Sequence, residues 1–331
     1  MNNKFAVGIT GTGSYLPEKI LTNFDLEKMV DTSDEWIKTR TGIENRRVAD
    51  ETMATSDLAT KAARRAMQDA GVKAEELDMI IVATVTPDMA FPSTACIVQK
   101  NIGAINATAF DVEAACTGFI YGMVIAEQFI KTGFYKKVLV IGAETLSKFL
   151  DWEDRNTCVL FGDGAGAAII EKTAKDTGIM SSYLGADGKS GDCLTLPGGG
   201  SRNPATHNTV DNSLHYVKMD GNDVFKFAVR IMSSSALKAL ELGNLDVSEI
   251  DCLIPHQANI RIIKSAARRL KLPMDKVYIN LNNYGNMSAA SIPVALDEAV
   301  NTGKVKKGDN ILLVAFGGGL TWGSTIIKWQ K

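Results

Sequence analysis

Short apolar runs of strand length alternate along this chain with segments in which apolar residues recur at helical spacing. This alternation predicts an α/β protein in which helices cover sheets. The predicted strands are 76–82, 138–142, 164–170, 249–255, 311–317 and 319–327. The predicted helices are 57–70, 117–130, 231–242 and 258–271, and the second of them is apolar on nearly every side.

The second half of the chain repeats the pattern of the first. Glu-Leu-Asp-Met-Ile-Ile-Val at 76–82 resembles Glu-Ile-Asp-Cys-Leu-Ile-Pro at 249–255, and each follows an Ala-rich helical segment. Phe-Ile-Lys-Thr-Gly at 129–133 resembles Ala-Val-Asn-Thr-Gly at 299–303, and each leads into a buried strand. We interpret this as an internal duplication of a βαβ-rich unit rather than a short-period repeat.

The join between the repeats is predicted at 173–178, where the sequence is polar and turn-like. An N-terminal half would then span 1–175 and a C-terminal half 176–331. A duplicated fold of this kind places equivalent helix starts opposite each other, so we expect a pocket between the halves.

Cys116 stands among small residues immediately before the apolar helix 117–130. A helix N-terminus carries partial positive charge and unpaired N–H groups, so it favours a thiolate over a thiol. A thiolate beside donors that receive an oxyanion is equipped for acyl transfer. A lone cysteine in this position would be better interpreted as a small buried residue that packs at the start of a core helix. Its polar partners favour catalysis instead.

His256 and Asn286 are these partners. His256 ends an apolar run and stands at the carboxyl end of a predicted strand, where ligands gather in α/β sheets. Asn286 lies in a second small-residue stretch before an apolar helix. If the Thr-Gly sequences that end the two helices are equivalent, counting back from them pairs Asn286 with Cys116. The three side chains would then face one pocket, whereas His256 alone would be read as a buried, satisfied imidazole.

Three consecutive glycines, 317–319, follow a predicted strand. Glycine lets a backbone pass close to a ligand and leaves its N–H groups bare. No Lys-Ser/Thr follows, so a phosphate cradle is a weak interpretation. We predict a turn that stabilises an oxyanion, with the N–H groups of Cys116 and Gly318 as donors.

The helix 258–271 has an apolar side and an outer face that is entirely cationic. That face carries Arg261, Lys264, Arg268, Arg269 and Lys271. An ordinary solvated face is the usual interpretation of such a charge run. Because this one directly follows His256 on a nearly neutral protein, we favour a docking surface for an acidic partner.

Composition narrows the class of protein further. The chain has 331 residues, 45% hydrophobic and 22% charged, with a net charge of −2, so no global field draws it to nucleic acid or membrane. Its five cysteines are widely spaced and odd in number, which argues against a disulfide framework or a zinc site and suits a reducing cytoplasm. The N-terminal apolar run after Lys4 is too short and too polar for a signal peptide, and the uncharged stretch from Glu113 to Glu127 is too short to span a membrane.

Taken together, the motifs resemble the 3-oxoacyl-acyl-carrier-protein synthase III family of thiolase-fold condensing enzymes, which initiate bacterial type II fatty-acid synthesis. The resemblance covers essentially the whole chain. Its motifs lie at 11–17, 39–43, 111–118, 162–166, 256–259, 285–286 and 316–323. It implies a layered α-β-α-β-α architecture with two duplicated halves. It also implies a homodimeric acyltransferase that condenses a short acyl-CoA with malonyl-acyl-carrier protein, without a metal or other cofactor.

The resemblance assigns expected roles to individual residues. The family's Cys-His-Asn set falls on Cys116, His256 and Asn286. The remaining expectations are coenzyme A binding by Trp36, Arg40, Arg155 and Asn259, carrier-protein docking by Arg261, Lys264, Arg268 and Arg269, and an acyl pocket with Phe316 and, from across a dimer, Phe91. Trp36 and Arg155 would sandwich the adenine. Segment 185–216 is expected to border the acyl pocket.

Other interpretations stay open at this point. A cysteine thioesterase would also use a thiol and an imidazole, but it must admit water to the acyl-enzyme. A non-catalytic scaffold would have no need of the complete Cys-His-Asn set. A specialised homologue that makes polyketide or secondary-metabolite starters would share all the motifs.

Overall fold

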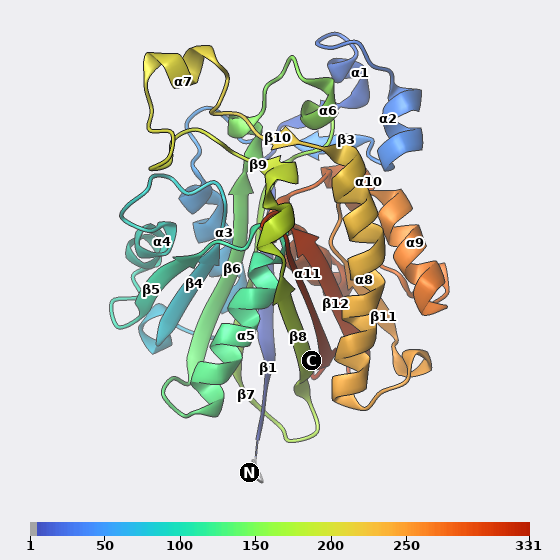
Figure 1. The fold of residues 1–331 in the computed structure, drawn as a ribbon. Coiled ribbons are helices and arrows are strands. Elements are labelled where there is room, and N and C mark those ends of the chain that lie inside the picture. Colours follow the sequence, from blue (N-terminus) through green and yellow to red (C-terminus); the bar gives the residue numbers. More distant parts are fainter. Residues whose placement is uncertain (1–4) are drawn as a thin grey trace.

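The computed structural model describes residues 5–331, which form two large β-sheets with helices between and outside them (Figure 1). The first sheet has the order β1-β7-β6-β4-β5 and the second the order β11-β12-β13-β8. The strands of the first are β1 (Ala6–Tyr15), β4 (Met79–Ala83), β5 (Thr108–Val112), β6 (Lys137–Thr145) and β7 (Asp163–Thr173). Those of the second are β8 (Gly178–Ala186), β11 (Cys252–Pro255), β12 (Asn310–Gly317) and β13 (Thr321–Lys328). Two small sheets pair β2 (Ile20–Thr22) with β3 (Asn45–Arg47) and β9 (Leu194–Thr195) with β10 (Lys218–Met219).

The two large sheets have the same topology. In the first, β1 and β6 lie antiparallel to β7, and β4 lies parallel to β6. In the second, β8 and β12 lie antiparallel to β13, and β11 lies parallel to β12. The internal duplication is therefore confirmed, with β5 as an additional parallel strand at the edge of the first sheet.

The sheets divide the chain at one connection. Strands of the first sheet end at Thr173 and those of the second begin at Gly178. We propose on this basis that the halves separate at 175/176. The first four residues of the N-terminal half, and with them the start of the segment judged unlike a signal peptide, lie outside the described residues.

Two helices lie between the sheets and contact strands of both, namely α5 (Gly118–Lys131) and α11 (Ser291–Asn301). Outer helices cover the far faces: α3 (Thr55–Ala70) and α4 (Thr94–Ile102) on the first sheet, α8 (Gly221–Gly243) and α9 (Ile260–Leu270) on the second (Figure 1). The shorter helices are α1 (Asn23–Leu26), α2 (Asp34–Thr41), α6 (Arg155–Cys158), α7 (His207–Asp211) and α10 (Leu281–Tyr284). The order of layers is α-β-α-β-α, as expected.

Every predicted strand and helix is present, with shifted ends. The helix predicted at 231–242 begins ten residues earlier because Asp220 caps it, accepting from the backbone N–H groups of Asn222 and Asp223. The helix predicted at 258–271 begins at Ile260, where the Asn259 side chain is the N-cap. Side-chain caps therefore set these boundaries, which periodicity alone leaves open.

Glycines let the first sheet and α11 lie in direct contact. A Cβ on Gly142 of β6 would lie 2.2 Å from the Ala289 carbonyl oxygen, and one on Gly166 of β7 would lie 2.6 Å from the Val294 backbone nitrogen. This close approach brings the start of α11 next to the start of α5. Within residues 5–331, no helix has both the length and the apolar character needed to cross a bilayer.

Candidate active site

Cys116 lies in a 3-10 turn, Ala115–Thr117, that runs directly into α5. Ala115 has a φ of 45°, and this left-handed conformation turns the chain sharply between β5 and the helix. Gly317, at the end of β12, packs so tightly on this turn that a Cβ there would lie 2.7 Å from the Cys116 backbone nitrogen. The thiol is thereby fixed, 7% exposed, at the predicted start of the helix.

His256 follows β11 directly, and its backbone N–H donates to the Val314 carbonyl at 2.8 Å. Its Nδ1 lies 2.6 Å from the Oγ of Ser291, the first residue of α11. The Ser291 Oγ also accepts a long hydrogen bond, 3.5 Å, from the Gln257 backbone N–H. Because the Ser291 Oγ already accepts this hydrogen bond, we assign its proton to Nδ1, and this assignment places the proton of the neutral imidazole on Nε2. The ring of Phe316 packs edge-on to the imidazole, with centroids 5.7 Å apart.

Asn286 is held by the backbone on both sides. Its N–H donates to the Leu160 carbonyl at 2.9 Å, and its carbonyl accepts from Gly162 N–H at 3.0 Å. Its side-chain Oδ1 accepts from the backbone N–H of Ser288 at 2.9 Å. Within residues 5–331 the Nδ2 group has no hydrogen-bond partner, which leaves it as a donor for a ligand.

One small cavity, of about 90 Å³, is lined by Cys116, His256 and Asn286 together. The three residues come from the starts of α5 and α11 and from the end of β11. The spacing argument predicted that they would share a pocket between the halves, and this is where the structure places them. A thiol and two neutral donors facing one space can hold an acyl thioester and a developing oxyanion.

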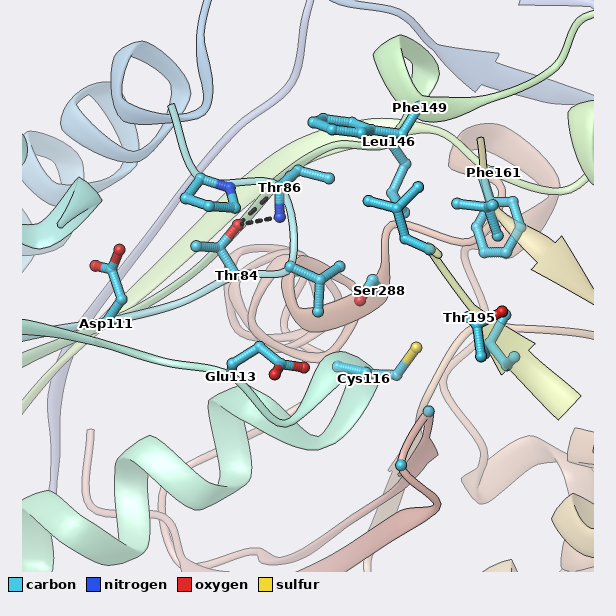
Figure 2. A pocket seen from close by; sticks show the side chains of 18 of the residues that line it. Thr84, Thr86, Asp111, Glu113, Cys116, Leu146, Phe149, Phe161, Thr195 and Ser288 are labelled. Atoms are coloured by element: carbon cyan, nitrogen blue, oxygen red, sulfur yellow. Dashed lines mark hydrogen bonds between the residues drawn. The ribbon is translucent and has the colours of Figure 1, made fainter. Parts of the chain in front are cut away.

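A second, larger cavity of about 640 Å³ also reaches Cys116 (Figure 2). One side of it is apolar, with Leu146, Phe149, Phe161 and Val217, and another is polar, with Thr84, Thr86, Asp111, Glu113 and Ser288. Leu194, Thr195 and Leu196 also line it, so part of segment 185–216 borders this cavity. Cys116 is common to both cavities.

The protonation of the site differs from the expectation of a thiolate. Burial raises the pKa of the Cys116 thiol to about 12, although the nearby Ser288 hydroxyl acts in the opposite direction. Burial also lowers the pKa of His256 to about 3. Desolvation therefore disfavours both charged forms, and it favours a thiol and a neutral imidazole in the resting site.

The pairing of Cys116 with Asn286 is wrong by three residues. The second half repeats the turn before α5 at Ser288–Ala290, and Ser288 has the same φ of 45° as Ala115. This alignment pairs Cys116 with Ala289. Counting from the helix ends failed because α5 has 14 residues and α11 only 11. Asn286 nevertheless reaches the cavity, because it lies just before the turn.

Comparison with known proteins decides the family. Family models described as 3-oxoacyl-[acyl-carrier-protein] synthase III match residues 110–188, and the C-terminal model of the same description matches 240–329. Beta-ketoacyl-[acyl-carrier-protein] synthase III of Caldanaerobacter subterraneus subsp. tengcongensis is 66% identical over 331 residues, 100% of each chain. The chain belongs to the synthase III family.

Solved structures of the family agree with this. The 3-oxoacyl-[acyl-carrier-protein] synthase III of Aquifex aeolicus VF5 is 49% identical with a TM-score of 0.91, covering 98% of this chain and 100% of its own. The priming β-ketosynthase of the R1128 polyketide pathway is 33% identical with a TM-score of 0.92, covering 100% of this chain and 98% of its own. The predicted thiolase-like fold and the predicted condensing-enzyme family are both confirmed.

Among the residues that the resemblance assigns to coenzyme A, Arg40 and Arg155 are exposed and Trp36 is partly exposed. The Arg155 Cζ lies 5.1 Å from the centroid of the Trp36 ring, and Arg155 Nη1 donates to the Asp31 carbonyl at 2.7 Å. Asn259 lines the cavity and donates through Nδ2 to the Arg40 carbonyl at 3.0 Å. Asn259 therefore joins the cavity to α2, which carries both Trp36 and Arg40.

The glycine turn and the two phenylalanines occupy different places in this synthase III. Gly318 lines the larger cavity, with its backbone next to the Cys116 turn. Phe316 lines the smaller cavity and does not line the larger one. If the larger cavity holds the acyl chain, Phe316 is therefore not part of its wall. Phe91 lies outside both with its side chain 85% exposed, although its neighbour Ala90 lines the larger cavity. An acyl-pocket role for Phe91 thus requires a second subunit.

The cationic helix face has the predicted orientation. On α9, the apolar residues Ile262, Ile263, Ala266, Ala267 and Leu270 are buried. The basic residues Arg261, Lys264, Arg268, Arg269 and Lys271 are all exposed. The face begins next to Asn259, at the mouth of the small cavity.

Two residues at the site were missed from the sequence. Ser291 holds the His256 ring, and its signal was the Ser that opens α11 in a small-residue stretch. Glu144 of β6 is fully buried behind the larger cavity, accepting from Thr86 Oγ1 at 2.6 Å and Thr84 Oγ1 at 3.1 Å. Burial raises the pKa of Glu144 to about 7 and its charge raises that of Cys116. A carboxyl inside a strand-like run gave no sign that it would lie near the thiol.

Proposed function

We propose that this chain condenses a short acyl-CoA primer with malonyl-acyl-carrier protein. The products are 3-oxoacyl-acyl-carrier protein, coenzyme A and CO2, and the reaction initiates type II fatty-acid synthesis. Membership of the synthase III family supports this activity. The observation that carries the roles of individual residues is the single cavity shared by Cys116, His256 and Asn286.

In the first half-reaction, the sulfur of Cys116 attacks the thioester carbonyl of the primer. The tetrahedral oxyanion receives hydrogen bonds from the backbone N–H groups of Cys116 and Gly318. The new S–C bond forms, the primer's bond to the coenzyme A sulfur breaks, and the thiol proton ends on coenzyme A. Trp36, Arg40 and Arg155 hold the nucleotide end during this step.

In the second half-reaction, the malonyl carrier docks on the basic face of α9 and its arm enters the small cavity past Asn259. Loss of CO2 breaks the malonyl C–C bond and places negative charge on the thioester oxygen. Nε2–H of His256 and Nδ2–H of Asn286 donate to that oxygen, and each donor contributes about 3 kcal/mol. The carbanion attacks the acyl group on Cys116, and the released sulfur takes up a proton from water.

The chemistry needs no metal and no redox cofactor. The oxidation of the malonyl carboxyl carbon to CO2 is balanced by the reduction of the primer's thioester carbon to a ketone, so no external electron carrier is needed, and the two neutral donors accommodate the developing charge. Acyl-CoA is a substrate and not a cofactor. We place the enzyme in the cytoplasm, because its substrates and its thiol chemistry belong there.

A homodimer is part of the proposal. Phe91 is exposed close in sequence to Met89 and Ala90, which line the larger cavity. A second copy seated on this face would bury Phe91 and close the cavity around the primer's acyl chain. Light scattering at micromolar concentration that showed only a monomer would contradict this arrangement.

One experiment tests the assignment of the two half-reactions. Labelled acyl-CoA and malonyl carrier are supplied separately to the variants His256→Ala and Asn286→Ala. Intact protein mass measures acylation by acyl-CoA, and CO2 release measures decarboxylation of the malonyl carrier. Cys116 should still take up the acyl label in both variants. CO2 release should fall by two or more orders of magnitude in each, because each variant loses one donor that contributes about 3 kcal/mol. Normal decarboxylation by either variant would refute its role.

Two alternative functions are distinguished by further measurements on the wild-type protein. The 33% identity to the R1128 priming ketosynthase favours a polyketide starter enzyme as second candidate, and a panel of acyl-CoA primers with malonyl carrier distinguishes it by primer preference. A cysteine thioesterase would release free acid steadily from acyl-CoA alone. A condensing enzyme would stop at a stable acyl-enzyme.

A further inference from the structure

Arg46, on β3, is a buried cation without an acidic partner. Its side chain is 0% exposed, and no carboxylate within residues 5–331 lies within ion-pair distance of it. Burial lowers its pKa to about 10, which still leaves it charged at neutral pH. Burying an unpaired charge is costly, so the groups that Arg46 does contact are expected to explain its presence.

Its guanidinium joins β3 to two other segments, residues 21–23 and the end of α6, through neutral acceptors. Nη1 donates to the Leu21 carbonyl at 3.2 Å and to Asn23 Oδ1 at 2.9 Å. Nη2 donates to the same Oδ1 at 2.9 Å and to the Val159 carbonyl at 2.9 Å. Leu21 lies on β2, Asn23 opens α1, and Val159 follows the last residue of α6.

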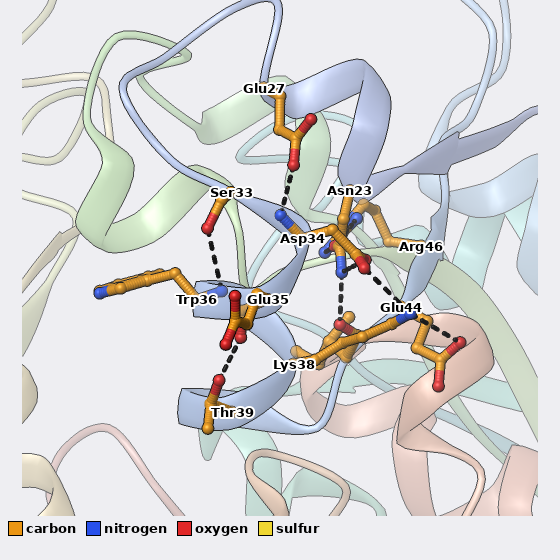
Figure 3. A network of polar contacts seen from close by, with 11 residues as sticks. Asn23, Glu27, Ser33, Asp34, Glu35, Trp36, Lys38, Thr39, Glu44 and Arg46 are labelled. Carbon is orange, nitrogen blue, oxygen red and sulfur yellow. Dashed lines mark hydrogen bonds and ion pairs between the residues drawn. The ribbon is translucent and has the colours of Figure 1, made fainter.

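Asn23 carries the connection onward to α2 (Figure 3). Its Nδ2 donates to Asp34 Oδ1 at 3.0 Å and to the Ile43 carbonyl at 2.8 Å. Asp34 is the first residue of α2, and Trp36 follows two residues later. A continuous set of hydrogen bonds therefore links the backbone that carries Trp36 to the end of α6, the helix that begins with Arg155.

The distance between Trp36 and Arg155 indicates why fixed backbone positions would matter for adenine binding. A flat ring stacked between two groups needs about 3.5 Å on each side, hence about 7 Å in total. Arg155 Cζ now lies 5.1 Å from the Trp36 ring centroid. A purine therefore enters when the Arg155 side chain moves by about 2 Å, leaving the Asp31 carbonyl, while the two backbones stay in place.

We propose that Arg46 is a positioning residue for the nucleotide end of acyl-CoA. It fixes α2 and α6 relative to each other, so that only one side chain has to rearrange when adenine binds. A preorganised pair of backbones lowers the ordering cost of binding and so raises affinity. The inference rests on the proposed function and concerns only the half-reaction that uses coenzyme A.

The test compares acyl-CoA with the same acyl group on pantetheine, which lacks the nucleotide. Arg46→Lys keeps the charge but not the planar fork that reaches both segments. Asp34→Ala cuts the link at its partly exposed end, and it serves where Arg46→Lys does not fold by circular dichroism. For both variants the KM for acyl-CoA should rise about tenfold with kcat unchanged. The KM for acyl-pantetheine should stay at the wild-type value.

Arg64→Lys is the matched control, because Arg64 is an exposed arginine on α3 that donates to the Asn101 carbonyl at 2.8 Å. Calorimetry with 3′-phosphoadenosine 5′-diphosphate adds a reading that does not depend on turnover, and its Kd should also weaken about tenfold in the two variants. An unchanged Kd and KM, or an equal rise of KM for both thioesters, would overturn the proposal. A wild-type protein that binds the nucleotide but acylates from neither thioester would instead count against the proposed function.

Discussion

The Nδ1 atom of His256 lies 2.6 Å from the Oγ of Ser291, and both residues are almost completely buried. The serine opens α11 in the second half, whereas the histidine ends a strand of the same half. With the assignment in which Ser291 donates to Nδ1, the imidazole presents Nε2–H to the cavity. A donor is what an enolate oxygen requires, so the serine hydroxyl determines whether His256 can serve it.

Ser291→Ala should lower the rate of malonyl-carrier decarboxylation about 10- to 100-fold, by analogy with the loss of the orienting partner of a metal-bound histidine. Acylation of Cys116 should be unchanged. Nitrogen NMR of His256 would show mixed tautomers in this variant and mainly the Nε2–H form in the wild type. Ser291→Thr, which keeps a hydroxyl, should retain more activity than Ser291→Ala, and equal loss in both would argue for a packing role only.

Alkylation of Cys116 by iodoacetamide should accelerate about tenfold per pH unit up to pH 10 without a plateau, because the pKa of the thiol is raised to about 12 and the thiolate fraction is still growing. Glu144→Gln removes a nearby negative charge. Since the Glu144 pKa is about 7, this carboxyl is charged at pH 9 and largely neutral at pH 6. The variant should therefore react faster than wild type at pH 9 and similarly at pH 6. The same ratio at both pH values would rule out an electrostatic effect.

Gly317→Ala should abolish acylation and lower the free energy of unfolding by about 1–3 kcal/mol, because the added methyl meets the Cys116 backbone nitrogen at 2.7 Å. Thermal unfolding and acyl uptake by intact mass measure the two effects. Gly188→Ala is the control, since a Cβ there meets nothing within 4 Å. Full acylation in Gly317→Ala would show that the turn around Cys116 can yield.

Charge reversal at Arg268 and Arg269, both exposed on α9, should raise the KM for malonyl carrier. The KM of the wild type should rise more steeply with ionic strength than the KM of the variant, because salt screens the attraction that the variant has lost. Uptake of the primer from acyl-CoA should not change. Reversal of Lys306 and Lys307, two exposed cations beyond α11, changes the net charge equally and is the matched control. Equal effects of both reversals would indicate a response to net charge and not a docking face.

The sequence pattern predicted the α/β layers, the duplication and six strands of the two large sheets, because buried strands and apolar helices have strong periodic signals. It did not predict β1, β5 or β8. It also brought Cys116, His256 and Asn286 to one pocket, since chain order places strand ends and helix starts together. The burial that raises the pKa of the Cys116 thiol depends on packing from α11 and β12, which are distant in the chain and gave no local signal. Glu144, Ser291 and Arg46 act through contacts with residues distant in the chain, and no local pattern marks such contacts.

Cys116 belongs to the walls of both the narrow and the wide cavity. In the proposed reaction, an acyl chain bound to this sulfur occupies the larger cavity and leaves the small cavity free for the second thioester. Both thioesters would then reach Cys116 through the small cavity. Each is therefore expected to compete with the other, and free coenzyme A is expected to inhibit the binding of both. The size of the larger cavity is also expected to limit the length of the primer, because a primer too long for it would extend into the small cavity and prevent the second thioester from binding.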